Sequence, residues 1–146
     1  MYYKLTLLIQ AFFWTLICTQ THGDTIDHYM NIVNNIPQME MKADAQSQAW
    51  AHSARTVITL TCDGIADTLT LANETAKQQG HPLFCLSGST PINAEMLSSL
   101  IKQTYQELST PQSEKNKMTV SQIALLGLQK QYPCETKTPA FKLPGY

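Results

Sequence analysis

Charged residues are scarce in this chain. Lysine, arginine, aspartate and glutamate make up 14% of its 146 residues, and the formal net charge at pH 7 is −1. A protein that binds nucleic acid or an anionic membrane through charge carries a basic patch or stripe, and this composition offers none. We therefore expect no nucleic-acid partner, and we expect any partner surface to be recognised by shape and polar groups.

Patterns of catalytic and metal-binding residues are also missing from the sequence. It has no HExxH motif, no paired CxxC motif, no close cluster of His, Asp and Glu, and no glycine-rich phosphate loop. The stretch 87–89 (Ser-Gly-Ser) predicts a flexible turn and not a GxSxG nucleophile elbow. Asp63 and Asp67 share one face of a predicted helix, where a solvated acidic stripe is far commoner than an acid–base pair. The sequence thus predicts a protein that is not an enzyme and that uses no cofactor or metal.

The N-terminal stretch is apolar. Lys4 is the only charge before Asp24, and the almost continuous apolar run from Leu5 to Cys18 is interrupted at Gln10. A basic residue before a run of this length is typical of a secretory signal peptide, whereas a membrane-spanning helix needs about 20 apolar residues. We predict a signal peptide over 1–23, cleaved before Asp24, and a single exported domain over 24–146 without a membrane span. An uncleaved N-terminal anchor is the alternative.

Three cysteines follow the predicted cleavage site. An odd number in an exported protein implies one unpaired thiol or a bridge between chains. Cys62 lies on an apolar stripe with helical spacing, where cysteine is most often a small buried hydrophobe. Cys85 and Cys134 instead follow proline-containing segments, at places where loops can bring two thiols together. We predict a Cys85–Cys134 disulfide, and the pairings that include Cys62 remain the alternatives.

The apolar residues of the mature chain recur mostly at helical spacing. The helices that this pattern predicts cover 24–35, ended by Pro37; 40–79, ended by Gly80; 90–110, opened by Thr90 and Pro91; and 119–132, opened by the capping pair Thr119 and Gln122. Two alternatives concern the second helix, namely a break near Gly64 and a short strand over 56–61. The expected fold class is all-α, a small bundle of about four helices stapled by the disulfide.

Two polar segments complete the prediction. Residues 109–117 contain no apolar residue except proline, and we predict a solvated loop there. A loop on a rigid scaffold often carries recognition, so 109–117 is the predicted binding surface, with a plain connector as the alternative. The tail over 135–146 is predicted to run extended over the surface.

The two cysteine frames resemble a known family. The stretch Pro82-Leu-Phe-Cys85-Leu, a helix, a polar loop and then Gly127-Leu-Gln-Lys-Gln-Tyr-Pro-Cys134 are similar to the resistance-associated (Rap/Tai-type) immunity proteins of type VI secretion systems. The residues that match as they stand are Phe84, Cys85, Leu128, Tyr132, Pro133 and Cys134. Gly127 stands where the family usually has alanine, Ser87 stands where a proline is common, and Cys62 lacks the tyrosine-glycine motif often found beside it.

The resemblance implies a function and a location. It implies a periplasmic immunity protein that binds a peptidoglycan amidase toxin delivered by type VI secretion and blocks its active site, often as a homodimer. The alternative function is that of a non-enzymatic periplasmic accessory or chaperone-like envelope protein on the same scaffold. Because a fold does not determine function, helices and a disulfide alone do not separate the two.

Overall fold

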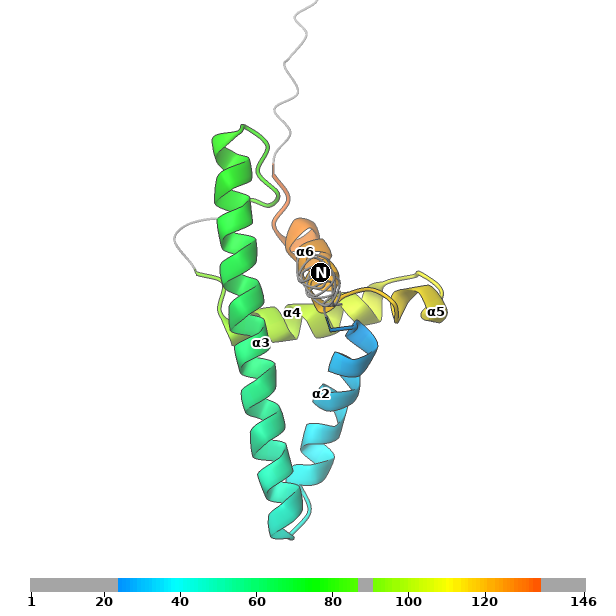
Figure 1. Ribbon diagram of the computed structural model, residues 1–146. Helices are drawn as coiled ribbons and strands as arrows, with labels where there is room; N and C mark the ends of the chain where they lie inside the picture. Colours follow the sequence, from blue (N-terminus) through cyan, green and yellow to red (C-terminus); the bar gives the residue numbers. More distant parts are fainter. Residues whose placement is uncertain (1–23, 87–90, 135–146) are drawn as a thin grey trace, which may run out of the picture.

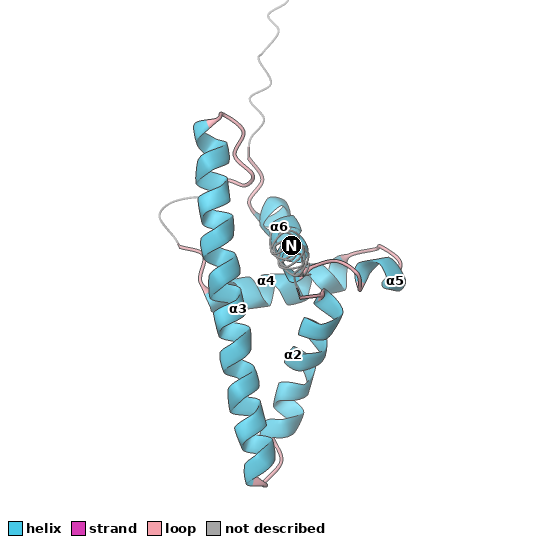
Figure 2. Cartoon of the chain, viewed as in Figure 1, coloured by secondary structure: helices cyan, strands magenta, loops and turns pink. Residues whose placement is uncertain are grey.

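The computed structural model describes residues 24–86 and 91–134, and these residues fold into helices joined by short connections (Figure 1). The helices are α2 (Ile26–Glu40), α3 (Ala45–Gln78), α4 (Ala94–Glu107), α5 (Gln112–Lys115) and α6 (Val120–Gln131). Figure 2 shows no strand in the described ranges, so the all-α prediction is confirmed. The predicted signal peptide, the Ser-Gly-Ser turn and the predicted extended tail lie outside the described residues.

The arrangement centres on the long helix α3. α2 and α3 form an antiparallel hairpin whose arms diverge from the turn at its tip, α4 crosses α3, and α6 packs on α4 (Figure 1). The described helices thus cover one side of α3 and leave its other side uncovered. No helix among the described residues is both long enough and apolar enough to cross a membrane.

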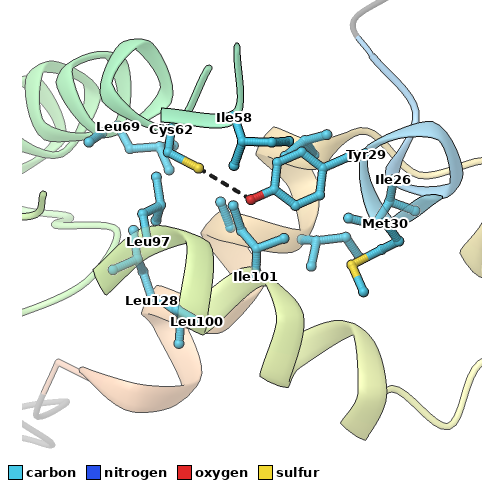
Figure 3. Close-up of a cluster of buried hydrophobic side chains, with 14 of the residues drawn as sticks. Ile26, Tyr29, Met30, Ile58, Cys62, Leu69, Leu97, Leu100, Ile101 and Leu128 are labelled. Carbon is cyan, nitrogen blue, oxygen red and sulfur yellow. Dashed lines mark hydrogen bonds between the residues drawn. The ribbon is translucent and has the colours of Figure 1, made fainter. Parts of the chain in front are cut away.

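The hydrophobic core lies where α2, α3, α4 and α6 meet (Figure 3). Its fully buried side chains include Ile26, Tyr29, Cys62, Leu97, Ile101, Ile123 and Leu128. On α3 the buried positions recur every three or four residues along one stripe, which is the pattern that predicted this helix from the sequence. Burial of these apolar surfaces is the main force that holds the four helices together.

The first helix runs further than predicted. The sequence placed its end at residue 35, before Pro37, but α2 continues through the proline to Glu40. Proline removes only one helical hydrogen bond, and here tertiary contacts hold the last turn. The side chain of Gln48 donates a hydrogen bond of 2.7 Å to the Glu40 carbonyl, and Arg55 forms an ion pair with the Glu40 carboxylate.

The second helix begins later than predicted, and it is continuous. It starts at Ala45 because the Asp44 side chain caps it, accepting a hydrogen bond of 2.8 Å from the Ser47 N–H. That hydrogen bond lowers the pKa of Asp44. Neither alternative for this segment occurs, since helix runs through 56–61 and through Gly64. Gly80, with a φ of +85°, ends the helix as predicted.

The third helix also begins later than predicted. Asn93 is its N-cap, accepting a hydrogen bond of 2.9 Å from the Met96 N–H, so the helix does not open at Thr90 and Pro91. The asparagine side chain at this point satisfies an unpaired helix N–H, which fixes the helix start three residues after the predicted N-cap.

The last helix begins as predicted. Thr119 accepts a hydrogen bond of 3.2 Å from the Gln122 N–H, while the Gln122 side chain accepts one of 2.8 Å from the Thr119 N–H. This reciprocal pair is the capping box that the sequence indicated.

Candidate functional site

The predicted disulfide is present in the structure. The sulfur atoms of Cys85 and Cys134 lie 2.11 Å apart, and the two Cα atoms lie 4.9 Å apart. Cys62 is fully buried and takes no part in a bridge. The disulfide therefore joins the segment that follows α3 to the end of α6, as the sequence predicted.

The residues beside the disulfide tie the two cysteine frames together. The Cys85 N–H donates a hydrogen bond of 2.8 Å to the Tyr132 carbonyl. Phe84 is buried in the core, and its N–H donates to the Asn73 side chain of α3 at 3.1 Å. The segment around Cys85 is thus held by the core, by α3 and by the end of α6. Its aromatic residue acts as an anchor in the core.

The unpaired cysteine belongs to a small polar cluster inside the core. The Tyr29 hydroxyl lies 3.3 Å from the Cys62 sulfur (Figure 3). It also lies 3.1 Å from the Ser98 hydroxyl. Burial raises the pKa of Cys62, and burial together with the contact to Cys62 raises the pKa of Tyr29. The thiol consequently stays neutral and inaccessible, which is a structural role and not a reactive one.

The raised thiol pKa predicts how stability depends on pH. Below the ordinary pKa of 9.0 the neutral thiol makes its full contribution to stability. Above that value the unfolded chain ionises Cys62 before the folded chain does, so the free energy of unfolding falls as pH rises towards the raised pKa. Urea unfolding from about pH 7 to about pH 10 should show this decline in the wild type and a shallower one in Cys62→Ala. Equal slopes for the two proteins would contradict the assignment.

The predicted binding loop is more ordered than expected. Residues 109–117 contain the short helix α5, and Lys115 is only 8% exposed, so the prediction of a wholly solvated loop is wrong. The Lys115 ammonium donates a hydrogen bond of 3.0 Å to the Tyr105 carbonyl and lies 4.4 Å from the centre of the Tyr105 ring. A carbonyl oxygen and an aromatic face together compensate for the lost water, which allows a charged group to fold inward.

The predicted acidic pair and the histidines all lie at the surface. Asp63 and Asp67 are exposed on α3, and His28, His52 and His81 are exposed at separate places. No group of three His, Cys, Asp or Glu side chains within 24–86 and 91–134 is placed to hold a metal ion.

A cleft lies between the arms of the hairpin and α4. It has a volume of about 640 Å³, and its apolar lining includes Ile36 of α2 and Ile58 of α3. Its charged lining is mixed, with Arg55 and Asp63 on α3 facing Glu95 and Lys102 on α4. A cleft with an apolar floor and charges of both signs suits a protruding protein segment better than a small ion.

Four large apolar side chains are exposed on the side of α3 that faces away from the core. We call it the α3 outer face, and its residues are Trp50, Val57, Leu60, Gly64 and Leu71. The apolar spacing in the sequence predicted the buried stripe of this helix but not this surface. The signal was present in the spacing of seven residues from Trp50 through Val57 and Gly64 to Leu71, a second stripe beside the core stripe.

Gly127 lies where α6 crosses α4 closely. A Cβ atom at this position would overlap the Thr104 hydroxyl oxygen and lie 2.8 Å from Cγ of Leu100. Both neighbours are buried, so they have little room to shift. The absence of a side chain at this position therefore has a steric cause in this chain.

No protein-family model, no curated protein and no solved structure matches this chain.

Proposed function

We propose that this protein is a periplasmic immunity protein that binds and inhibits a peptidoglycan amidase toxin delivered by type VI secretion. The main support for the proposal is that the two cysteine frames lie together in the structure. Phe84-Cys85 and Tyr132-Pro133-Cys134, the residues on which the family resemblance rests, meet at one disulfide and share a backbone hydrogen bond. They form a single structural unit, which supports treating them as one motif.

The surface of the hairpin supports a binding role. A small domain normally exposes few contiguous apolar side chains, and larger apolar patches commonly mark interaction sites. Here the α3 outer face and the cleft beside α4 lie on different sides of the same hairpin. A protein inhibitor gains most of its affinity from a few desolvated anchor residues, and this hairpin offers such anchors.

Co-expression tests the proposal. An amidase encoded beside this gene is directed to the periplasm of a sensitive cell, together with either the full-length chain or a copy that starts at Asp24. We expect the full-length chain to restore growth and the leaderless copy to fail, because inhibitor and toxin must meet in the same compartment. Growth curves and a mass measurement of the periplasmic protein, expected to start near Asp24, provide the readout.

A matched control separates inhibition from mere reduction of toxin level. A catalytically inactive toxin should co-elute with the protein in size-exclusion chromatography, since binding does not need toxin activity. If neither form of the chain protects and no complex elutes, the immunity function is wrong and the accessory envelope function takes its place.

A further inference from the structure

We propose that the α3 outer face binds a helical segment of the partner protein, one that carries an apolar stripe bordered by basic side chains. The inference rests on the proposed function, because it names the surface through which the toxin is held. It concerns a different surface from residues 109–117, which the sequence had favoured.

The apolar part of the surface is large and exposed. Val57 is 52% exposed, Leu60 and Leu71 are each 66% exposed, and Trp50 is 39% exposed. Spacings of seven, three and eleven residues place them along one side of a straight helix. With a rise of 1.5 Å per residue, the stripe from Trp50 to Leu71 is about 30 Å long. A partner helix of about 20 residues would cover that length.

A groove continues this surface towards α2. It has a volume of about 430 Å³ and runs between Ile32 and Asn35 of α2 and Trp50 and Val57 of α3. Large side chains of a partner helix can therefore enter this groove near Trp50, so the contact would include α2 as well as the outward-facing side chains of α3.

Gly64 interrupts the stripe at its middle, and no neighbour among the described residues requires a glycine there. A Cβ atom there would meet nothing within 4 Å. Glycine within a helix is less stable than alanine, and it occurs where another backbone or a bulky side chain approaches closely. An approach from outside the chain accounts for a glycine at this point.

Carboxylates border the stripe on the side away from the groove. Asp63, Asp67 and Glu74 are exposed there and lie on one flank of α3. The ion pairs in the described part of the chain use Glu40, Glu107 and Glu114, so none of these three carboxylates is paired there, although Asp63 also lines the cleft beside α4. Basic side chains along one border of a partner helix would complement them.

The same carboxylates argue against a second copy of this chain as the occupant. If two α3 helices packed antiparallel across Gly64, Asp63 of one copy would lie beside Asp67 of the other. Like charges brought together at an interface oppose association. A partner with basic residues is therefore the better fit.

Two synthetic helices of about 20 residues provide the probe. Both carry a leucine stripe, one bordered by lysines and the other by glutamates. Binding is followed by the fluorescence of Trp50, with the protein produced from residue 24 onwards with its disulfide intact. We expect the lysine helix to bind and the glutamate helix to bind at least about tenfold more weakly, with affinity falling as salt rises.

Substitutions locate the binding. Leu60→Glu and Leu71→Glu should each weaken binding of the lysine helix by about tenfold or more. Leu126→Glu is the matched control, since Leu126 is an exposed leucine on α6, and it should leave binding unchanged. Equal loss in all three variants, or no binding of the lysine helix, overturns the proposal. So does a dimer of the wild type in sedimentation that Leu60→Glu dissociates, because a second copy then covers the face.

The failure of this inference is distinguishable from failure of the proposed function. If the wild type protects cells and Leu60→Glu and Leu71→Glu protect equally well, the immunity function stands and this surface is not the contact. If the wild type does not protect, the immunity function fails, whatever the helix titration shows.

Discussion

Reduction of the Cys85–Cys134 disulfide should lower the free energy of unfolding by about 4 kcal/mol. The two cysteines are 49 residues apart in the sequence, and closing a loop of that size restricts the unfolded chain by about this amount in the chain-entropy model. A domain of this size has only about 5–15 kcal/mol of stability, so a large share depends on one bond. Urea unfolding with and without dithiothreitol measures the difference.

The double variant Cys85→Ser with Cys134→Ser is the control for reduction. It should match the reduced wild type and should not respond to dithiothreitol, because Cys62 has no bridge to lose. Peptide mapping without reduction should recover one linked pair, Cys85 with Cys134. A linked peptide that contains Cys62 would disprove the pairing, and a reduced protein as stable as the oxidised one would disprove the role of the staple.

Two glycine-to-alanine substitutions should change stability in opposite directions. Gly127→Ala should lower the free energy of unfolding by about 1–2 kcal/mol, because overpacking against Leu100 and Thr104 outweighs the better helix propensity of alanine. Gly64→Ala should raise it by about 1 kcal/mol, because the same gain in helix propensity comes without a clash. Thermal and urea unfolding of the two variants and of the wild type measure the direction of each change in stability.

The pair serves as its own control, because the chemical change is identical and both sites lie inside helices. If Gly127→Ala is neutral or stabilising, α4 and α6 are further apart than described here. Thr104→Ser keeps the hydroxyl oxygen that a Cβ atom at position 127 would overlap, so Gly127→Ala should cost as much stability in the Thr104→Ser background as it does alone. Recovery from Thr104→Ala with Gly127→Ala, measured against Thr104→Ala, would instead locate the overlap at the threonine.

Local signals predicted most of the fold. The apolar periodicity located the buried stripe of α3, the Thr119–Gln122 pair located the start of α6, and Gly80 located the end of α3. These predictions are correct because each feature depends on neighbouring residues, through side-chain spacing or through a hydrogen bond within one turn.

Contacts beyond the local turn explain two of the wrong predictions, whereas the late starts of α3 and α4 are set locally by the N-cap residues Asp44 and Asn93. Pro37 remains inside α2 because residues of α3 hold the turn beyond it, and Lys115 is buried because Tyr105 supplies a carbonyl and a ring. Neither partner is a neighbour in the sequence. The α3 outer face was missed for another reason, since a second apolar stripe on a helix is taken for part of the core until the packing shows that no described helix covers it.

The antiparallel contact between Thr25 and Thr119 has a practical consequence for anyone who attaches a tag to this protein. Ile26 is fully buried, and its N–H donates a hydrogen bond of 2.9 Å to the Met118 carbonyl, while the Val120 N–H donates to the Asp24 carbonyl at 3.2 Å. Only two described residues, Asp24 and Thr25, therefore precede Ile26, which is fully buried in the core. A tag fused directly at Thr25 would replace Asp24, whose carbonyl accepts the Val120 N–H, so a tag should be attached through a spacer that ends before Asp24.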